Sequence, residues 1–211
     1  PPQQGHNMWS GFFQCPELVE FVKAQFYKGI YIESPMDYQV IQRNPKGEGK
    51  IIVQGRLGLD ARTADSLQYR LTAPGKKTSE WYPLTILLDE RTFKSTISVP
   101  AGGWYAIQVR AMEKSKSISE HSNEVHFGVG EVFVVAGQSN SANHGEEKQM
   151  TKTNRVTTRI GKSWVLCRDP QPGASGNGGS FMPPLGDAIA EKFGVPVGFV
   201  GSAESKQALI E

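Results

Sequence analysis

One short apolar run constrains the fold of this chain more than any other feature. Residues 132–136 (Val-Phe-Val-Val-Ala) include no polar side chain, and the run breaks off into Gly137-Gln138-Ser139-Asn140. A run without polar alternation is typical of a strand buried on both faces of a parallel sheet. Ligands of open α/β sheets bind at the carboxyl ends of such strands. Ser139 therefore lies where a nucleophile would be placed, although an ordinary polar turn would look the same.

A helix and a second apolar run follow this strand at some distance. Residues 183–194 predict a helix, because two prolines suit its first turn and Gly194 suits its end. Residues 195–200 then predict a second buried strand, parallel to the first in a right-handed βαβ unit. The apolar side of the helix is expected to comprise Leu185, Ala188, Ile189 and Phe193.

The middle of the chain has the alternating pattern of half-buried strands. Apolar residues recur at every second position between turn signals such as Pro74-Gly75, which predicts an antiparallel β-sandwich over residues 35–128. The residues expected to point inward are Ile51, Val53, Ile97, Ile107 and Val109. Trp81 and Trp104 are interpreted as core or sheet-face residues, with sugar stacking as the alternative.

These patterns divide the chain into three parts. Residues 1–34 form an N-terminal extension with one helix, residues 35–128 the β-sandwich, and residues 129–211 an α/β part. The α/β part contains a polar, turn-rich stretch over residues 141–182. A stretch of this length inside a compact domain is usually functional or mobile.

Composition excludes several classes of function. The 211 residues carry a net charge of +2, and lysine and arginine are dispersed, which argues against nucleic-acid binding and against a polybasic membrane patch. No apolar run approaches the roughly 20 residues of a membrane-spanning helix, so membrane insertion is not expected. Cys15 and Cys167 either pair or remain buried free thiols.

The segment around Ser139 resembles a known family. Residues 130–145 (Gly-Glu-Val-Phe-Val-Val-Ala-Gly-Gln-Ser-Asn-Ser-Ala-Asn-His-Gly) look like the first block of the SGNH hydrolases, in the sialate O-acetylesterase and carbohydrate-esterase branch. Residues 179–200 resemble the helix and second strand of that branch. The resemblance implies a three-layer, flavodoxin-like catalytic domain behind a β-sandwich, in a secreted or periplasmic hydrolase that needs no cofactor or metal.

The resemblance also implies roles for single residues. Ser139 would be the nucleophile, and its backbone N–H would donate to the oxyanion. Gly201 is the candidate for the second oxyanion donor, although the match around it is poor. Gln138 and Asn140 would lie next to the substrate, an acylated carbohydrate.

The catalytic base is the largest departure from the family pattern. The Asp-x-x-His of the family is absent, since no histidine follows His144. This absence predicts a C-terminally truncated sequence, or a missing part supplied by a partner chain. His144 is a conceivable substitute base, or a loop histidine with a local role. Asp169 and Asp187 are interpreted as free carboxylates, and Asp187 as solvated on its helix.

Two functions of different classes follow. The first is a serine esterase that removes acetyl or similar acyl groups from carbohydrate, with Ser139 as the nucleophile. The second is a non-catalytic, carbohydrate-binding β-sandwich protein with an incomplete hydrolase-like domain. His121 and His126 have no spacing with carboxylates or thiols that suggests a metal site.

Overall fold

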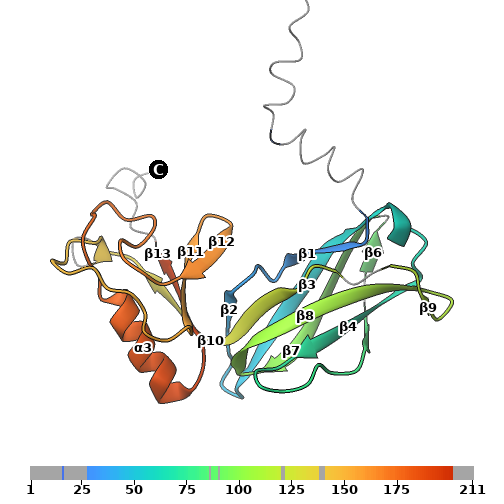
Figure 1. Ribbon diagram of the computed structural model, residues 1–211, viewed down its shortest axis with the longest axis horizontal. Coiled ribbons are helices and arrows are strands. Elements are labelled where there is room, and N and C mark those ends of the chain that lie inside the picture. Colours follow the sequence, from blue (N-terminus) through green and yellow to red (C-terminus); the bar gives the residue numbers. More distant parts are fainter. Residues whose placement is uncertain are drawn as a thin grey trace, which may run out of the picture.

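The computed structural model describes residues 16, 28–85, 87–89, 91–119, 122–137 and 141–201, which are mostly β-sheet (Figure 1). The helix expected after Cys15 lies outside these residues, apart from Pro16, Lys28 and Gly29. The first strands are β1 (Ile30–Ser34), β2 (Gln39–Gln42), β3 (Glu48–Leu57), β4 (Ser66–Thr72), β5 (Tyr82–Leu84), β6 (Leu87–Asp89) and β7 (Thr92–Pro100), with the 3₁₀ helix η1 (Leu59–Ala61) after β3. They are followed by β8 (Gly102–Glu113), β9 (Lys116–Ser117), β10 (Val125–Val135), β11 (Val156–Ile160), β12 (Ser163–Leu166), helix α3 (Met182–Phe193) and β13 (Val197–Gly201).

The first sheet is small and antiparallel, with strand order β1-β3-β7-β6. Side chains of β3 and β7 alternate between buried and exposed along the strands, because one face of the sheet is covered and the other meets solvent. The sheet begins before residue 35, where the sequence placed its start. Ile30 and Ile32 of β1 are buried and Tyr31 between them is 45% exposed, so β1 has the same alternation.

The second sheet is mixed, with strand order β12-β11-β13-β10-β8-β4-β5. Strand β2 also pairs with β10, and β9 with β8. The pairs around β8 and β4 are antiparallel, whereas β13 pairs in parallel with both β10 and β11. The parallel pairing of residues 131–135 with residues 197–201 confirms the strand pairing that the sequence predicts.

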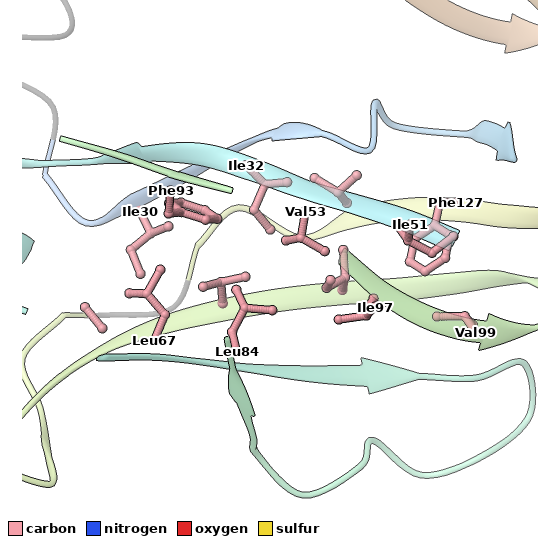
Figure 2. Packing of buried hydrophobic residues seen from close by; sticks show 14 of the residues in the cluster. Ile30, Ile32, Ile51, Val53, Leu67, Leu84, Phe93, Ile97, Val99 and Phe127 are labelled. Atoms are coloured by element: carbon pink, nitrogen blue, oxygen red, sulfur yellow. The ribbon is translucent and has the colours of Figure 1, made fainter. Parts of the chain in front are cut away.

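The main core lies between the two sheets, which pack face to face (Figure 2). The five residues expected to point inward (Ile51, Val53, Ile97, Ile107 and Val109) are all buried, as predicted. Larger side chains such as Phe93 and Phe127 fill the space between them. A fully buried Ile, Val or Phe contributes about 1.5–3 kcal/mol, so this layer supplies much of the stability.

Strand β10 belongs to both parts of the molecule. Its first half, residues 125–129, pairs antiparallel with β8, and its second half, residues 131–135, pairs parallel with β13. Strand β2 pairs with the middle of β10, at residues 127–130. One continuous strand therefore passes through residue 129, where the sequence placed the boundary between the sandwich and the α/β part.

Pro196 contacts three glycines at this junction, Gly103, Gly128 and Gly130. A Cβ on Gly103 would lie 3.0 Å from Pro196 Cγ, and one on Gly128 would lie 2.7 Å from the same atom. The Trp104 indole N–H also donates to the Asn154 carbonyl oxygen at 2.6 Å, which connects β8 to the loop before β11. Glycines at 103 and 128 thus allow the two parts to approach closely.

Helix α3 ends as predicted, but it buries a different face. Gly194 has φ +67° and its N–H donates to the Ala190 carbonyl oxygen at 2.9 Å, which gives the expected left-handed termination. The buried residues are Met182, Pro183, Gly186 and Ala190, whereas Leu185 and Phe193 are 41% and 48% exposed. Of the expected apolar side, only Ile189 packs against the core, so the prediction was wrong for Leu185, Ala188 and Phe193.

The reason is the close approach of α3 to its sheet at Gly186. A Cβ there would lie 2.4 Å from Val156 Cγ1 and 2.9 Å from Phe199 Cε2. A small residue sets the helix–sheet distance, and the larger apolar side chains lie to either side. Hydrophobicity alone does not reveal such a contact.

The run of residues 132–136 is not buried on both faces, contrary to the sequence prediction. Phe133 is 37% exposed and Val134 is 71% exposed, and Val135 is the one buried residue of the run. Within the described residues, this half of β10 pairs with β13 on one side only, and β13 lies between β10 and β11. The strand is therefore an edge of the parallel part rather than its centre, which leaves the apolar side chains accessible.

Among the described residues, no helix is long and apolar enough to span a membrane.

Candidate active site

Three of the predicted site residues (Gln138, Ser139 and Asn140) lie outside the described residues. The residues that flank them are close together. A Cβ added to Gly137 would lie 2.7 Å from the Ser141 Oγ atom. Glycine at residue 137 allows this approach, because a side chain there would force Ser141 to move.

Gly201, the predicted second oxyanion residue, ends the strand beside β10. It is the register partner of Val135, two residues before Gly137. Because β10 and β13 are parallel, their carboxyl ends meet at the same edge of the sheet. The loop after Cys167 also reaches this edge, since a Cβ on Gly201 would lie 3.3 Å from the Pro172 carbonyl oxygen. The oxyanion role of Gly201 stays a prediction.

Asn143 holds the segment after Ser139 in place. The residue is 1% exposed and has φ +60°, a conformation that asparagine tolerates better than most residues. Its Nδ2 donates to the carbonyl oxygens of Gln171 (2.8 Å) and Gly176 (3.3 Å), and its Oδ1 accepts from the Gln171 N–H at 2.9 Å. These bonds fix the loop over residues 168–181 against the segment that contains Asn143.

The glycine-rich part of that loop packs directly on backbone. A Cβ on Gly176 would lie 2.3 Å from the Ala142 carbonyl oxygen, and one on Gly179 would lie 1.7 Å from the Glu147 carbonyl oxygen. Gly145 and Gly179 form an isolated antiparallel bridge. These glycines, which the sequence suggested as part of a functional or mobile stretch, serve close backbone contact between two loops.

The sequence suggested that Asp169 is a free carboxylate. In the structure, its carboxylate accepts hydrogen bonds from four donors. Its oxygens accept from the Ser180 hydroxyl (2.7 Å) and N–H (2.8 Å), the Gln149 N–H (2.9 Å) and the Gln171 side-chain amide (3.0 Å). Sequence reasoning missed this role and that of Asn143. The signal that could have found them is a short polar side chain beside a glycine-rich loop.

Asp187 is likewise not simply solvated on α3. Its carboxylate accepts from the hydroxyls of Thr151 (2.5 Å) and Thr153 (2.8 Å) and from the N–H groups of Lys152 (2.7 Å) and Thr153 (3.1 Å). Partial burial acts to raise its pKa, but the hydrogen bonds outweigh burial and hold the pKa below the ordinary value of 3.8. Asp187 thus anchors the loop before β11 to the helix.

Cys167 is a free thiol in the interior below this loop, whereas Cys15 lies outside the described residues. Burial raises the pKa of the Cys167 thiol to about 12; the hydrogen bond to Gln171 lowers it somewhat, and the nearby Asp169 and Asp187 raise it. A thiol with so high a pKa is protonated at neutral pH. Cys167 is therefore a packing residue and no candidate nucleophile.

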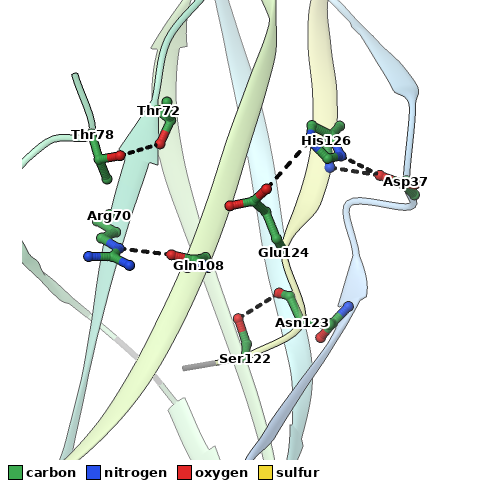
Figure 3. Close-up of polar contacts among 9 residues, drawn as sticks. All are labelled: Asp37, Arg70, Thr72, Thr78, Gln108, Ser122, Asn123, Glu124 and His126. Atoms are coloured by element: carbon green, nitrogen blue, oxygen red, sulfur yellow. Dashed lines mark hydrogen bonds and ion pairs between the residues drawn. The ribbon is translucent and has the colours of Figure 1, made fainter. Parts of the chain in front are cut away.

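Two histidines belong to the described residues, and the role of His144 as a substitute base stays a prediction. His126 lies in the first half of β10, where its Nδ1 is 3.2 Å from Asp37 Oδ1 and its Nε2 is 3.6 Å from Glu124 Oε1 (Figure 3). Nine residues of strand, roughly 30 Å, separate it from Val135. His144 lies in the loop that follows Ser139 and is exposed.

The described part of the chain brings together no group of three metal-ligating side chains. His121 lies outside it. The site that can be built is thus the meeting point of the ends of β10 and β13 and of the two loops held by Asn143.

Comparison with models of known protein families found no match, and no curated protein matches the chain.

Proposed function

We propose that the protein is a serine esterase that removes acetyl or similar acyl groups from carbohydrate, with Ser139 as the nucleophile. The observation that supports the proposal is the pairing of the carboxyl ends of β10 and β13, at Val135 and Gly201, just before residues 137–140 in the sequence. This segment directly follows a strand whose carboxyl end lies beside that of a parallel neighbour, β13. Such an edge is where α/β sheets bind their ligands.

The chemistry assigned to the site is acyl transfer. Ser139 Oγ attacks the ester carbonyl carbon, the alcohol of the sugar leaves, and water then releases the acyl group from the serine. The backbone N–H groups of Ser139 and Gly201 are the proposed donors to the oxyanion, and Gln138 and Asn140 are proposed to contact the substrate. The fold class proposed for this part is the three-layer SGNH architecture.

The proposed base remains to be assigned. A serine hydroxyl is a weak nucleophile until a neighbouring group accepts its proton. His126 is too far along β10, and His144 is exposed without a carboxylate partner among the described residues. The proposal therefore expects Asp-x-x-His, or a group of equivalent chemistry, at the turn in the active protein.

The test compares two serines of one loop in the full-length protein. Ser139→Ala should lower the turnover of acetylated sugars by roughly 10⁴-fold and abolish labelling by a fluorophosphonate probe. Ser141→Ala is the matched control, since it removes a hydroxyl two residues away, and it should retain both. Normal turnover in the Ser139→Ala protein would overturn the proposed role.

The second candidate function, non-catalytic binding of carbohydrate by the β-sandwich, has its own support. The outer face of the sandwich has an indole and two arginines in contact, an arrangement suited to binding a sugar without any catalysis. The fluorophosphonate experiment separates the two candidates, because a binding protein would not react with the probe.

A further inference from the structure

Trp81 lies against two arginines on the outer face of the second sheet. The guanidinium carbon of Arg110 is 4.3 Å from the centroid of the indole ring, and that of Arg70 is 4.6 Å from it. Trp81 immediately precedes β5, and the pairing of Tyr69 with Tyr82 places it next to Arg70 in the ladder. One indole thus contacts two cations on neighbouring strands.

Two glutamines fix the direction of the arginines. Arg110 Nε and Nη2 both donate to Gln68 Oε1, at 2.8 Å and 2.6 Å. Arg70 Nε donates to Gln108 Oε1 at 2.8 Å (Figure 3). Gln68 pairs with Arg110 across the strands, and Arg70 pairs with Gln108. Each guanidinium is therefore held by a neutral amide oxygen and by the indole.

The charge of the two arginines is not balanced locally. Within the described residues, neither guanidinium lies within ion-pair distance of a carboxylate. The loop between β4 and Trp81 adds Lys76 and Lys77 against one acidic residue, Glu80. The described residues also provide no acceptor for the Nη groups of Arg70. The face is thus a fixed, positively charged surface with an aromatic ring in it.

We propose that Trp81, Arg70 and Arg110 bind a carboxylated polysaccharide on the sandwich, away from the turn after β10. The guanidinium fork matches a carboxylate in two parallel hydrogen bonds, and the indole holds the two guanidinium groups beside each other. The choice of carbohydrate rests on the proposed function, whereas the negative charge of the ligand follows from the unbalanced arginines. The surface would hold the polymer while the esterase site acts on it.

The experiment measures binding to polygalacturonate by affinity electrophoresis and calorimetry. It uses the full-length Ser139→Ala protein, so that binding is independent of turnover. Methyl-esterified polygalacturonate is the matched probe, because its sugars are the same and its carboxylates are blocked. We expect binding to polygalacturonate, and binding at least roughly tenfold weaker to the methyl ester, as loss of charge-assisted hydrogen bonds implies.

Variants locate the surface. Arg70→Gln and Trp81→Ala should each weaken binding roughly tenfold. Arg70→Lys keeps the charge without the fork, and it should weaken binding nearly as much. Arg62→Gln is the control, because it removes one positive charge from an exposed turn, and it should change affinity less than about twofold. Circular dichroism and thermal melts establish that each variant is folded.

Three results would overturn the proposal: no binding of polygalacturonate, equal binding of its methyl ester, or equal affinity for the Arg70 variants and Arg62→Gln. Binding of heparin but not of polygalacturonate would also overturn it, since it would assign the surface to sulfate. Failure of the fluorophosphonate probe to label the wild-type protein at Ser139 would count only against the esterase proposal, because no step of the binding experiment depends on that labelling.

Discussion

Gly130 and Pro196 are in backbone contact at the junction between the two parts of the molecule. A Cβ at Gly130 would lie 1.9 Å from the Pro196 carbonyl oxygen, and the Glu131 N–H donates to that same oxygen at 3.0 Å. Strand β13 can therefore enter the sheet only where β10 has no side chain. Glu131 also bonds to the side chains of Gln42 and Arg43, which join β2 to the same point.

Gly130→Ala should destabilise the protein by about 3 kcal/mol, because the methyl group would push β13 out of register. Urea denaturation monitored by fluorescence measures the change. Gly161→Ala is the control: φ is +55° there and nothing lies within 4 Å of the added Cβ, so the cost should be about 1 kcal/mol from backbone strain alone. Equal costs at the two glycines would contradict the contact with Pro196.

Asp187 should make stability depend on pH in the acid range. Its pKa lies below the ordinary value of 3.8 in the folded protein, so its contribution is present above that value and is lost as the pH falls through the folded pKa. Asp187→Asn should cost about 1–2 kcal/mol at neutral pH, and the difference from wild type should shrink below pH 3.8. Chemical denaturation across the pH range measures this difference.

Glu191→Gln serves as the control for Asp187, since it removes a carboxylate from the exposed side of the same helix. Its effect should stay within roughly 0.5 kcal/mol at every pH. A pH-independent loss in the Asp187→Asn protein would show that the hydrogen bonds do not depend on the charge.

Cys167 should be unreactive in the folded protein. The thiol is buried and its pKa is raised to about 12, so only about one molecule in ten thousand carries the thiolate at about pH 8. In a Cys15→Ser protein, a thiol reagent such as dithionitrobenzoate should react within minutes in denaturant and hardly at all without it. Rapid reaction of the native protein would contradict the burial of Cys167.

Residues 1–211 assayed alone should hydrolyse acetyl esters slowly or not at all. The hydroxyl of Ser139 needs a base, His126 lies in the first half of β10 beside Asp37, and the Asp-x-x-His of the family pattern does not occur in residues 1–211. Hydrolysis of p-nitrophenyl acetate, with the uncatalysed rate subtracted, measures the activity. Robust hydrolysis that His144→Ala abolishes would instead assign the base to His144.

Sequence patterns predicted those features that depend on one strand or one helix at a time. The inward positions of Ile51 and Ile107 follow from alternation along their strands, and the end of α3 follows from Gly194. Contacts between elements were harder to predict. Gly186 and Gly130 determine how closely a helix and a strand approach, but a glycine in the sequence does not reveal whether it serves flexibility or contact.

In the candidate site, too, features of single strands could be predicted and contacts between distant segments could not. The meeting of the carboxyl ends of β10 and β13 could be predicted, because it depends on the two apolar runs and on their parallel pairing. The network of Asn143 and Asp169 could not, since it joins loops that are distant in sequence. The exposure of Val134 depends on what covers a sheet edge, which local patterns do not encode.

The continuity of β10 determines where the protein can be truncated or cleaved without breaking a strand. A cleavage after residue 129 would sever a hydrogen-bonded strand rather than a linker, because residues 127–130 pair with β2, and separation of the fragments would leave strand edges without their partners. Fragments with such open edges tend to aggregate. The sandwich and the strand that ends just before Gly137 are thereby parts of one hydrogen-bonded sheet.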